Sequence, residues 1–164
     1  MRTVINSCCF TGHRQIPLAE LAPLTQHLDD VLSALYRDGC RDFYAGGALG
    51  FDTLAASRVL LLRREHPDAR LHLLLPCRDQ AKDWPPPEAA RFEEILSRAD
   101  TFRYVREEYA ASAMADRNRE LVEEGDICVA YVRRRGSGSG QTARLAHDKG
   151  ITVINLADRF LSAL

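Results

Sequence analysis

The fold is indicated most clearly by the stretch Phe43-Tyr44-Ala45-Gly46-Gly47-Ala48-Leu49-Gly50-Phe51-Asp52. Its first three residues suit a short strand, and the two glycines that follow end that strand. From Phe51 to Leu62 apolar residues recur at helical spacing, until His66-Pro67-Asp68 breaks the pattern. A strand that runs through glycines directly into an amphipathic helix is typical of α/β proteins with parallel sheets.

The same alternation continues along the rest of the chain. Residues 71–75 form an apolar run, interrupted by His72 and closed by Pro76, which suits a strand buried on both faces of a parallel sheet. We predict strands at residues 3–10, 43–45, 71–75, 102–105, 126–132 and 151–156. We predict helices at 18–36, 51–65, 88–99, 111–124 and 142–149, a loop at 133–140 and a short final helix at 158–164. This pattern predicts one α/β domain over residues 1–164, with a mostly parallel central sheet between two layers of helices.

Length, composition and charge exclude several classes of protein. The 164 residues fit one domain, and 46% hydrophobic with 27% charged residues is ordinary for a globular protein. The longest apolar runs are far shorter than the roughly 20 residues of a membrane-spanning helix, and no signal peptide is evident at the N-terminus. A net charge of −1 argues against broad electrostatic binding of nucleic acid, although it is compatible with a local basic patch.

The cysteines indicate neither a disulfide framework nor a metal site. Their number, five, is odd, and none lies in a C-x-x-C pair. The histidines likewise form no H-x-x-x-H pair, so we expect no bound metal. With no export signal, free cysteines point to the reducing cytoplasm.

Three loops that follow predicted strands are unusual. They are Thr11-Gly12-His13-Arg14, the Gly46–Asp52 stretch and the Gly136–Thr142 stretch. In open α/β sheets ligands bind outside the carboxyl ends of the strands, where these loops would meet. Glycine lets the backbone approach a ligand, and a helix N-terminus offers free N–H groups to an anion. The two glycine-rich loops therefore suit a phosphate, although each alone could be a tight turn.

Several side chains near these loops have a functional and a structural interpretation. Arg14 could hold a phosphate bidentately, or it could be a solvated surface residue. Together with the N–H groups around Gly138 to Thr142, we expect it to hold the phosphate of a ligand. Asp52 lies in the first turn of a helix, where it complements the helix dipole or bonds a ribose hydroxyl. His13 either contacts the ligand or is an ordinary loop residue.

Other candidates lie further along the chain. Asn118 falls on the apolar side of its helix, where an amide needs partners, and this makes a ligand role for neighbouring Arg117 an equal alternative to simple solvation. Trp84 and Tyr109 lie in loops after strands, where they could stack a base or simply pack. Residues Arg133-Arg134-Arg135 suit a solvated loop, with attraction of phosphate as the second interpretation. No G-x-S-x-G motif is present, which disfavours serine hydrolase chemistry.

These residues together resemble the SLOG superfamily, and within it the YpsA-like proteins. The matching pieces are Thr11-Gly12-His13-Arg14, the Gly46–Asp52 stretch, Leu75-Pro76 with Gln80 and Trp84, Tyr109, Arg117-Asn118, Asp126 and Gly140-Gln141-Thr142. The resemblance implies a Rossmann-like fold that binds a nucleotide or a nucleotide derivative. The expected ligand site comprises Thr11, Gly12, His13, Arg14, Gly46, Gly47, Ala48, Gly50, Asp52, Gln80, Trp84, Tyr109, Arg117, Asn118, Gly138, Ser139, Gly140 and Thr142.

The resemblance implies three functions of different classes. The first is binding or sensing of a nucleotide-derived ligand, without turnover and without a further cofactor. The second is N-glycosidic hydrolysis, as in the related LOG phosphoribohydrolases, in which Arg117 would be the helix arginine. The catalytic glutamate of those enzymes is missing, since Ala143 to Ala146 follow the Gly140-Gln141-Thr142 loop. The third, least favoured, is the single-stranded DNA binding of the related DprA proteins, which calls for a basic groove with aromatic residues. No protein partner is predicted, and a homo-oligomer remains open.

Overall fold

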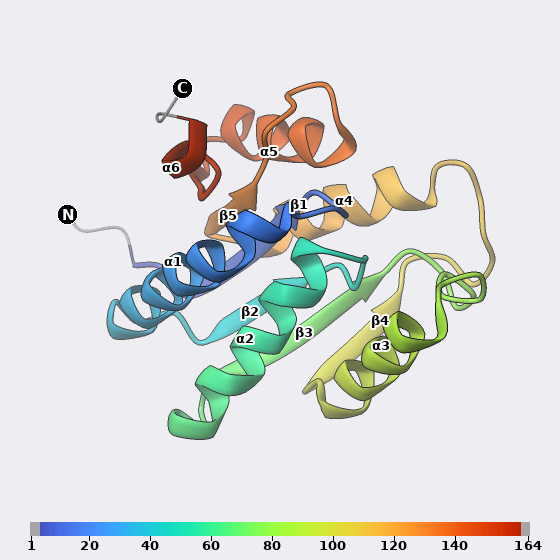
Figure 1. Cartoon of the computed structure of the whole chain (residues 1–164), viewed down its shortest axis with the longest axis horizontal. Coiled ribbons are helices and arrows are strands. Elements are labelled where there is room, and N and C mark those ends of the chain that lie inside the picture. Colours follow the sequence, from blue (N-terminus) through green and yellow to red (C-terminus); the bar gives the residue numbers. More distant parts are fainter. Residues whose placement is uncertain (1–3, 162–164) are drawn as a thin grey trace.

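The computed structural model describes residues 4–161 and contains a single parallel sheet (Figure 1). Its six strands lie in the order β4-β3-β2-β1-β5-β6. The strands are β1 (Ser7–Gly12), β2 (Asp42–Ala45), β3 (Arg70–Leu75), β4 (Thr101–Tyr104), β5 (Ile127–Tyr131) and β6 (Thr152–Asn155). The helices are α1 (Leu18–Arg37), α2 (Phe51–Glu65), α3 (Pro86–Arg98), α4 (Ala113–Glu124), α5 (Gly138–Asp148) and α6 (Asp158–Leu161).

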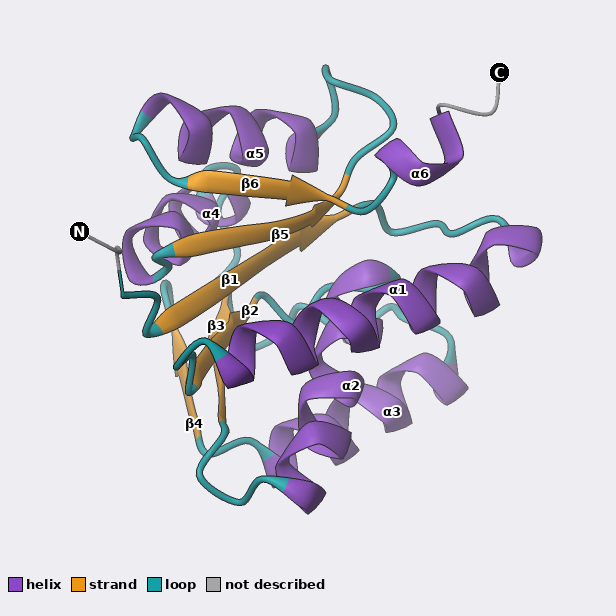
Figure 2. Cartoon of the chain, turned by 90° about the vertical axis from the view of Figure 1, so that its left-hand side faces the viewer, coloured by secondary structure: helices purple, strands orange, loops and turns teal. Residues whose placement is uncertain are grey.

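The two faces of the sheet are covered by different helices (Figure 2). Helices α1, α2 and α3 pack on one face, and α4 and α5 pack on the other. Alternate residues of β5 supply the two cores: Val129 and Tyr131 face α1 and α2, whereas Cys128 and Ala130 face the opposite layer. A strand buried on both faces reads as a continuous apolar run, as β5 does, whereas in β3 the half-buried His72 interrupts the run of leucines. The expected Rossmann-like three-layer fold is therefore confirmed.

The direction of chain winding reverses between β1 and β5. From β1 the chain passes to β2, β3 and β4 at one edge, and it then returns to place β5 on the other side of β1. The two strands are in register from Cys8 opposite Ile127 to Gly12 opposite Tyr131. Loops that leave such neighbouring strands diverge to opposite faces of the sheet, and this opens a crevice at their carboxyl ends.

Two predicted boundaries are wrong in ways that affect the site. Strand β1 extends through Thr11 and Gly12, because these residues pair with β5. Its predicted start, Thr3, lies outside the described residues. Helix α5 begins at Gly138, four residues early, because the Ser137 side chain caps it by accepting the Gly140 N–H at 3.0 Å. The end of the predicted final helix, 162–164, also lies outside the described residues.

Two further expectations concern the apolar segments and the cysteines. Among residues 4–161, no helix combines the length and the apolar character needed to cross a membrane. All five cysteines are buried and carry free thiols. They behave as small core residues of the sheet and its neighbouring loops.

Candidate functional site

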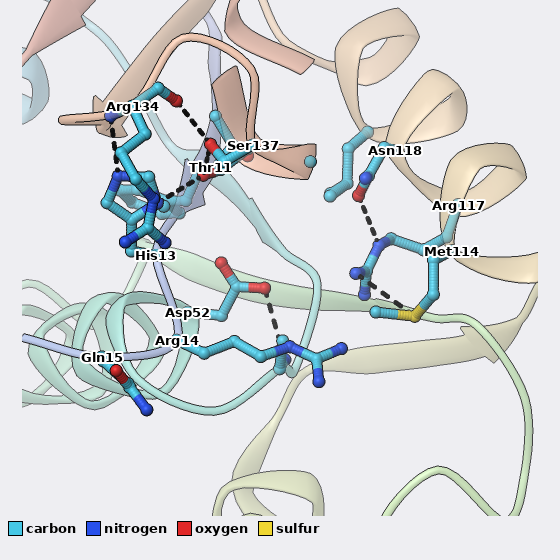
Figure 3. Close-up of a pocket in the computed structure, with 16 residues that line it drawn as sticks. Thr11, His13, Arg14, Gln15, Asp52, Met114, Arg117, Asn118, Arg134 and Ser137 are labelled. Carbon is cyan, nitrogen blue, oxygen red and sulfur yellow. Dashed lines mark hydrogen bonds between the residues drawn. The ribbon is translucent and has the colours of Figure 1, made fainter. Parts of the chain in front are cut away.

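A cavity of about 450 Å³ opens at the carboxyl ends of β1 and β5, where the winding of the chain reverses (Figure 3). This volume lies within the range of ordinary small-molecule sites. The loops after β1, β2 and β5 all contribute to it, together with one side of α4. Its lining residues are Phe10, Thr11, Gly12, His13, Arg14, Gln15, Ala48, Asp52, Met114, Arg117, Asn118, Leu121, Arg134, Ser137, Gly138 and Ser139.

His13 joins the loop after β1 to the loop after β5. Its Nε2 accepts the backbone N–H groups of Arg133 at 2.7 Å and Arg134 at 3.3 Å. Its Nδ1 lies 3.0 Å from Ser139 Oγ and donates to that oxygen, because Nε2 is occupied as the acceptor. Burial lowers the pKa of His13, and the charges of Arg134 and Arg133 lower it further. His13 is therefore a neutral side chain that positions the loop.

Asp52 brings a buried carboxylate to the floor of the cavity. It lies in the first turn of α2, is only 5% exposed, and its Oδ2 accepts the Ala48 N–H at 3.3 Å. Burial raises the pKa of Asp52 to about 6, against the opposing effects of Arg117, the Ala48 N–H and Arg14. This carboxylate retains acceptor capacity toward the cavity, because a single backbone donor occupies only one of its lone pairs.

Arg117 is buried beneath the same cavity and is held by other residues of the chain. Its Nη1 donates to the Gly46 carbonyl and, at 3.5 Å, to the Leu74 carbonyl, and its Nε donates to Asn118 Oδ1 at 2.8 Å. Burial lowers the pKa of Arg117, and nearby Arg14 lowers it further, while Asp52 raises it. A Cβ at position 46 would lie 2.5 Å from Nη1, so glycine is needed there.

This arrangement corrects the expected orientation of α4. The sequence placed Asn118 on the buried side and left Arg117 beside it, but Arg117 is the buried residue and Asn118 is only half-buried. Both line the cavity.

Among the described residues that line the cavity, arginines outnumber carboxylates. Arg14 and Arg134 are exposed, and among the described residues neither guanidinium has an ion-pair or hydrogen-bond partner. The adjacent N-terminus of α5 adds the backbone N–H groups of Gly138 and Ser139, which no acceptor within residues 4–161 takes. Free N–H groups at a helix N-terminus favour an anion. The arrangement can therefore receive a phosphate beside the buried carboxylate of Asp52.

Ten of the expected site residues meet at this cavity, and the others do not line it. Gly46 packs against the Arg117 side chain and Gly47 against Leu75, and Gly50 adopts φ +77° where a side chain would meet the Arg14 backbone. Gly140 packs against the backbone of residues 134–135, and its N–H is taken by the Ser137 cap. Thr142 is buried and donates to the Gly138 carbonyl within α5.

The aromatic residues expected to stack a base lie outside the cavity. Trp84 packs edge-on against Phe92 of α3. Tyr109 is 71% exposed and borders a separate depression with Gln80, whose side chain donates to the Gly47 carbonyl at 3.2 Å. The packing interpretation therefore describes Trp84, and within residues 4–161 the buried Phe10 is the one Phe, Tyr or Trp that lines the cavity.

Sequence reasoning missed four polar or flexible lining residues. Ser137 carried a usable signal, because serine immediately before a helix is a preferred N-cap. Arg134 was covered only by the second interpretation of the Arg133-Arg134-Arg135 run, attraction of phosphate, and nothing in the sequence distinguishes it from its two neighbours. In the structure Arg133 pairs with Glu20 at 2.6 Å while Arg134 faces the cavity. Gln15 and Met114 also line the cavity.

No group of three or more His, Cys, Asp or Glu side chains within the described chain is arranged to hold a metal ion. The donors around the cavity are mainly arginines and backbone N–H groups, which bind anions. Fold and site together define an α/β protein of the Rossmann-like class with an anion-suited cavity at its topological switch point.

The chain belongs to a known family of this class. The model of the YspA SLOG family (YpsA) matches residues 8–148, so this protein is a member of the YpsA family of SLOG proteins. The uncharacterised SPbeta prophage-derived protein YoqJ of Bacillus subtilis is 27% identical over 109 residues, which cover 59% of this chain and 64% of YoqJ. The UPF0398 protein YpsA of Bacillus subtilis is 30% identical over 69 residues, which cover 42% of this chain and 38% of YpsA. The chain therefore spans less than two thirds of either relative.

Two solved structures share the fold. DNA processing protein A (DprA) from Helicobacter pylori, described for its single-stranded DNA binding mode, superposes with a TM-score of 0.66 at 19% identity and covers 96% of this chain and 72% of its own. The Streptococcus pneumoniae DprA gives a TM-score of 0.63 at 15% identity, covering 90% of this chain and 49% of its own. At these identities the likeness establishes the fold alone.

Proposed function

We propose that this protein binds a nucleotide-derived ligand at the cavity and senses its presence. The observation that carries the proposal is the combination of unpaired Arg14 and Arg134 with the free N–H groups at the start of α5. A phosphate in contact with these groups would gain charge-assisted hydrogen bonds from both guanidinium forks. The neutral His13 keeps the α5 loop in place for this contact.

Asp52 would hold the sugar of the same ligand. Its carboxylate is buried beside the positive groups and has acceptor capacity to spare. A ribose hydroxyl could donate to it while the phosphate contacts Arg14. A carboxylate and a phosphate site together favour a nucleotide, whose ribose hydroxyl can donate to Asp52, over a fully ionised simple anion, which has no donor for that carboxylate.

A thermal-shift screen tests this function. Nucleoside monophosphates, ADP-ribose and NAD are each added to the full chain, with inorganic phosphate as the control for anion binding alone. A ligand that binds only the native state raises stability by RT ln(1 + [L]/Kd). We expect at least one nucleotide to stabilise the protein more than inorganic phosphate does. If none of them exceeds inorganic phosphate, nucleotide binding is wrong.

The second candidate is N-glycosidic hydrolysis, which Asp52 favours. Among the described residues it is the single carboxylate that lines the cavity, at the floor next to Arg117. It could take a proton from water as the water oxygen bonds the anomeric carbon of the sugar and the bond from that carbon to the base breaks. The released base takes up a proton from solvent, and Asp52 returns its own proton to solvent.

Release of free base distinguishes the enzyme from the sensor. The nucleotides of the thermal screen are incubated with the protein and with the Asp52→Asn variant. Sustained release that is lost in Asp52→Asn favours hydrolysis, whereas thermal stabilisation without release favours sensing. We favour sensing, because the glutamate that LOG hydrolases use is absent after the Gly140-Gln141-Thr142 loop.

The structural likeness to DprA makes DNA binding a third outcome to measure. Broad binding of single-stranded DNA would produce an affinity that falls steeply with salt, as counterions are released. A net charge of −1 disfavours this outcome.

We further propose a cytoplasmic location, since five buried free thiols suit a reducing compartment.

A further inference from the structure

One wall of the cavity is a single face of helix α4. Met114 and Leu121 supply apolar side chains to this wall, and Asn118 supplies the amide between them. Asn118 follows Met114 by four residues and precedes Leu121 by three, so the three side chains lie on one face of the helix. The α4 wall therefore combines apolar surface with one polar group, as the flat face and the polar edge of a base require.

The α4 wall is separated from the proposed phosphate site by the carboxylate of Asp52. Figure 3 shows Asp52 between Ser137, which precedes α5, and Asn118 of α4. On the α4 side Asp52 has Arg117 as its neighbour, since a Cβ at position 46 would lie 2.9 Å from Asp52 Oδ2 and 2.5 Å from Arg117 Nη1. A nucleotide with its phosphate at the start of α5 and its sugar at Asp52 would thus place its base against α4.

The side-chain amide of Asn118 has one orientation. The Nε–H of Arg117 can only donate, and it lies 2.8 Å from Asn118 Oδ1. Arg117 is itself held in place, because its Nη1 donates to the carbonyls of Gly46 and Leu74. The amide oxygen is therefore directed at Arg117, and the amide nitrogen Nδ2 is the end that remains for a ligand.

The two N–H groups on Asn118 Nδ2 are available to the cavity. No acceptor within residues 4–161 takes them. Every buried side-chain nitrogen or oxygen of the described chain has a partner, so the unpartnered Nδ2 of the half-buried Asn118 is not enclosed by protein. Its neighbours on the wall compete little, because a thioether sulfur is a weak acceptor and leucine has none. The α4 wall therefore presents a hydrogen-bond donor of fixed orientation.

We infer that the cavity selects a nucleotide whose base presents a carbonyl oxygen to Asn118 Nδ2. This inference rests on the proposed function. Guanine and hypoxanthine carry such an oxygen at C6 and uracil carries one at C4, whereas adenine and cytosine carry an amino group at the same positions. An amino group facing Nδ2 would leave two donors opposed and unpaired. The ligand class is therefore an oxo-base nucleotide, that is, a 6-oxopurine or a 4-oxopyrimidine.

Calorimetric titration of the full chain with two matched pairs of nucleotides tests the inference. Inosine monophosphate is compared with AMP, and UMP with CMP, because the members of each pair differ in the oxo or amino group and the protonation of the adjacent ring nitrogen. In at least one pair we expect the oxo member to bind about three- to tenfold more tightly, as one ordinary hydrogen bond predicts. Equal affinities within both pairs, or tighter binding of the amino members, would overturn the inference.

Two variants of Asn118 assign the preference to its amide. Asn118→Asp places an acceptor where Nδ2 stands, while its other oxygen still accepts from Arg117 Nε. The preference within a pair should then reverse, and the added negative charge should weaken both members alike, so the ratio of affinities is the readout. Asn118→Ala should make the two members bind equally, and it supplies the test if Asn118→Asp does not fold.

Glu123→Gln provides the matched control for these variants. Glu123 is an exposed residue of the same helix and does not line the cavity. This variant should keep the wild-type ratio of affinities in both pairs. An oxo preference that persists unchanged in Asn118→Ala, or one that Glu123→Gln also abolishes, would overturn the assignment to Asn118.

The outcomes separate this inference from the function on which it rests. If nucleoside monophosphates bind more tightly than inorganic phosphate but show no oxo preference, the inference is wrong and nucleotide binding stands. If none of the four binds more tightly than inorganic phosphate, both the inference and the proposed function fail.

Discussion

Arg14 and Arg117 lie at the same cavity but have opposite roles. Arg117 is 3% exposed and donates to the carbonyl of Gly46, whereas Arg14 is exposed and has no partner among the described residues. Removal of a buried charge leaves neighbouring groups unpaired, while removal of a free surface charge disturbs little. Arg117 therefore stabilises the site, whereas Arg14 remains available to a ligand.

Stability measurements on two alanine variants check this division. Arg117→Ala should lower the free energy of unfolding by about 3–5 kcal/mol at pH 8, because Asp52 stays buried without its neighbouring positive charge. Arg14→Ala should change it by at most about 0.5 kcal/mol. The Arg117→Ala deficit should shrink below pH 6, where Asp52 becomes protonated and needs no counter-charge. Urea unfolding at pH 8 and below pH 6 gives the free energies of unfolding. Equal stabilities of the two variants would contradict the opposite roles of Arg117 and Arg14.

His13 gives the site a pH dependence. Its pKa in the folded state lies below the ordinary value of 6.5, so the unfolded chain binds more protons than the folded one. The stabilising effect of neutral His13 is therefore complete above about pH 6.5 and is lost as the pH falls through the window below it. His13→Gln, which cannot titrate, should remove this part of the pH dependence of Tm. Parallel Tm curves for the variant and wild type between pH 5 and 8 would show that His13 is not the titrating group.

At the scale of elements, the start of α5 combines two tasks. Ser137 caps the helix by accepting the Gly140 N–H, and the N–H groups of Gly138 and Ser139 remain for an anion. Ser137→Ala should lower the free energy of unfolding by about 0.5–2 kcal/mol, the usual effect of a lost cap. Ser137→Asp should preserve stability, since aspartate also caps, but its charge should weaken binding of a nucleoside monophosphate at least tenfold.

Denaturation and titration of the two Ser137 variants separate capping from binding. If Ser137→Asp binds the monophosphate as tightly as wild type, the start of α5 is not the phosphate site. A loss of stability as large as that of Ser137→Ala would show instead that aspartate does not cap here.

The elements themselves were largely predictable, and their ends were less so. Apolar periodicity is local, so the alternation of strands and helices could be read from the sequence. The extension of β1 to Gly12 depends on pairing with Tyr131, more than a hundred residues away. The early start of α5 depends on the Ser137 cap, which the predicted loop at 133–140 overlooked. Non-local pairing and capping therefore decided the boundaries.

The strand order of the whole sheet explains which candidate residues reach the site. The sheet order places β5 beside β1 and so brings the loops of residues 11–14 and 134–139 together across the crevice. Sequence predicted that both loops lie at the carboxyl edge, but it could not predict that Trp84 packs on Phe92 instead. The choice between Arg117 and Asn118 as the buried residue depended on the distant Gly46 carbonyl, which local periodicity cannot reveal.

We propose that this cavity recognises a phosphate through Arg14. Calorimetric titration of a nucleoside monophosphate and its unphosphorylated nucleoside into wild type and Arg14→Ala tests this role of Arg14. We expect the variant to bind the monophosphate about ten- to a hundred-fold more weakly, as loss of a charge-assisted bond predicts. Binding of the nucleoside should be unchanged. Equal losses for the two compounds would show that Arg14 does not contact the phosphate and would contradict the claim.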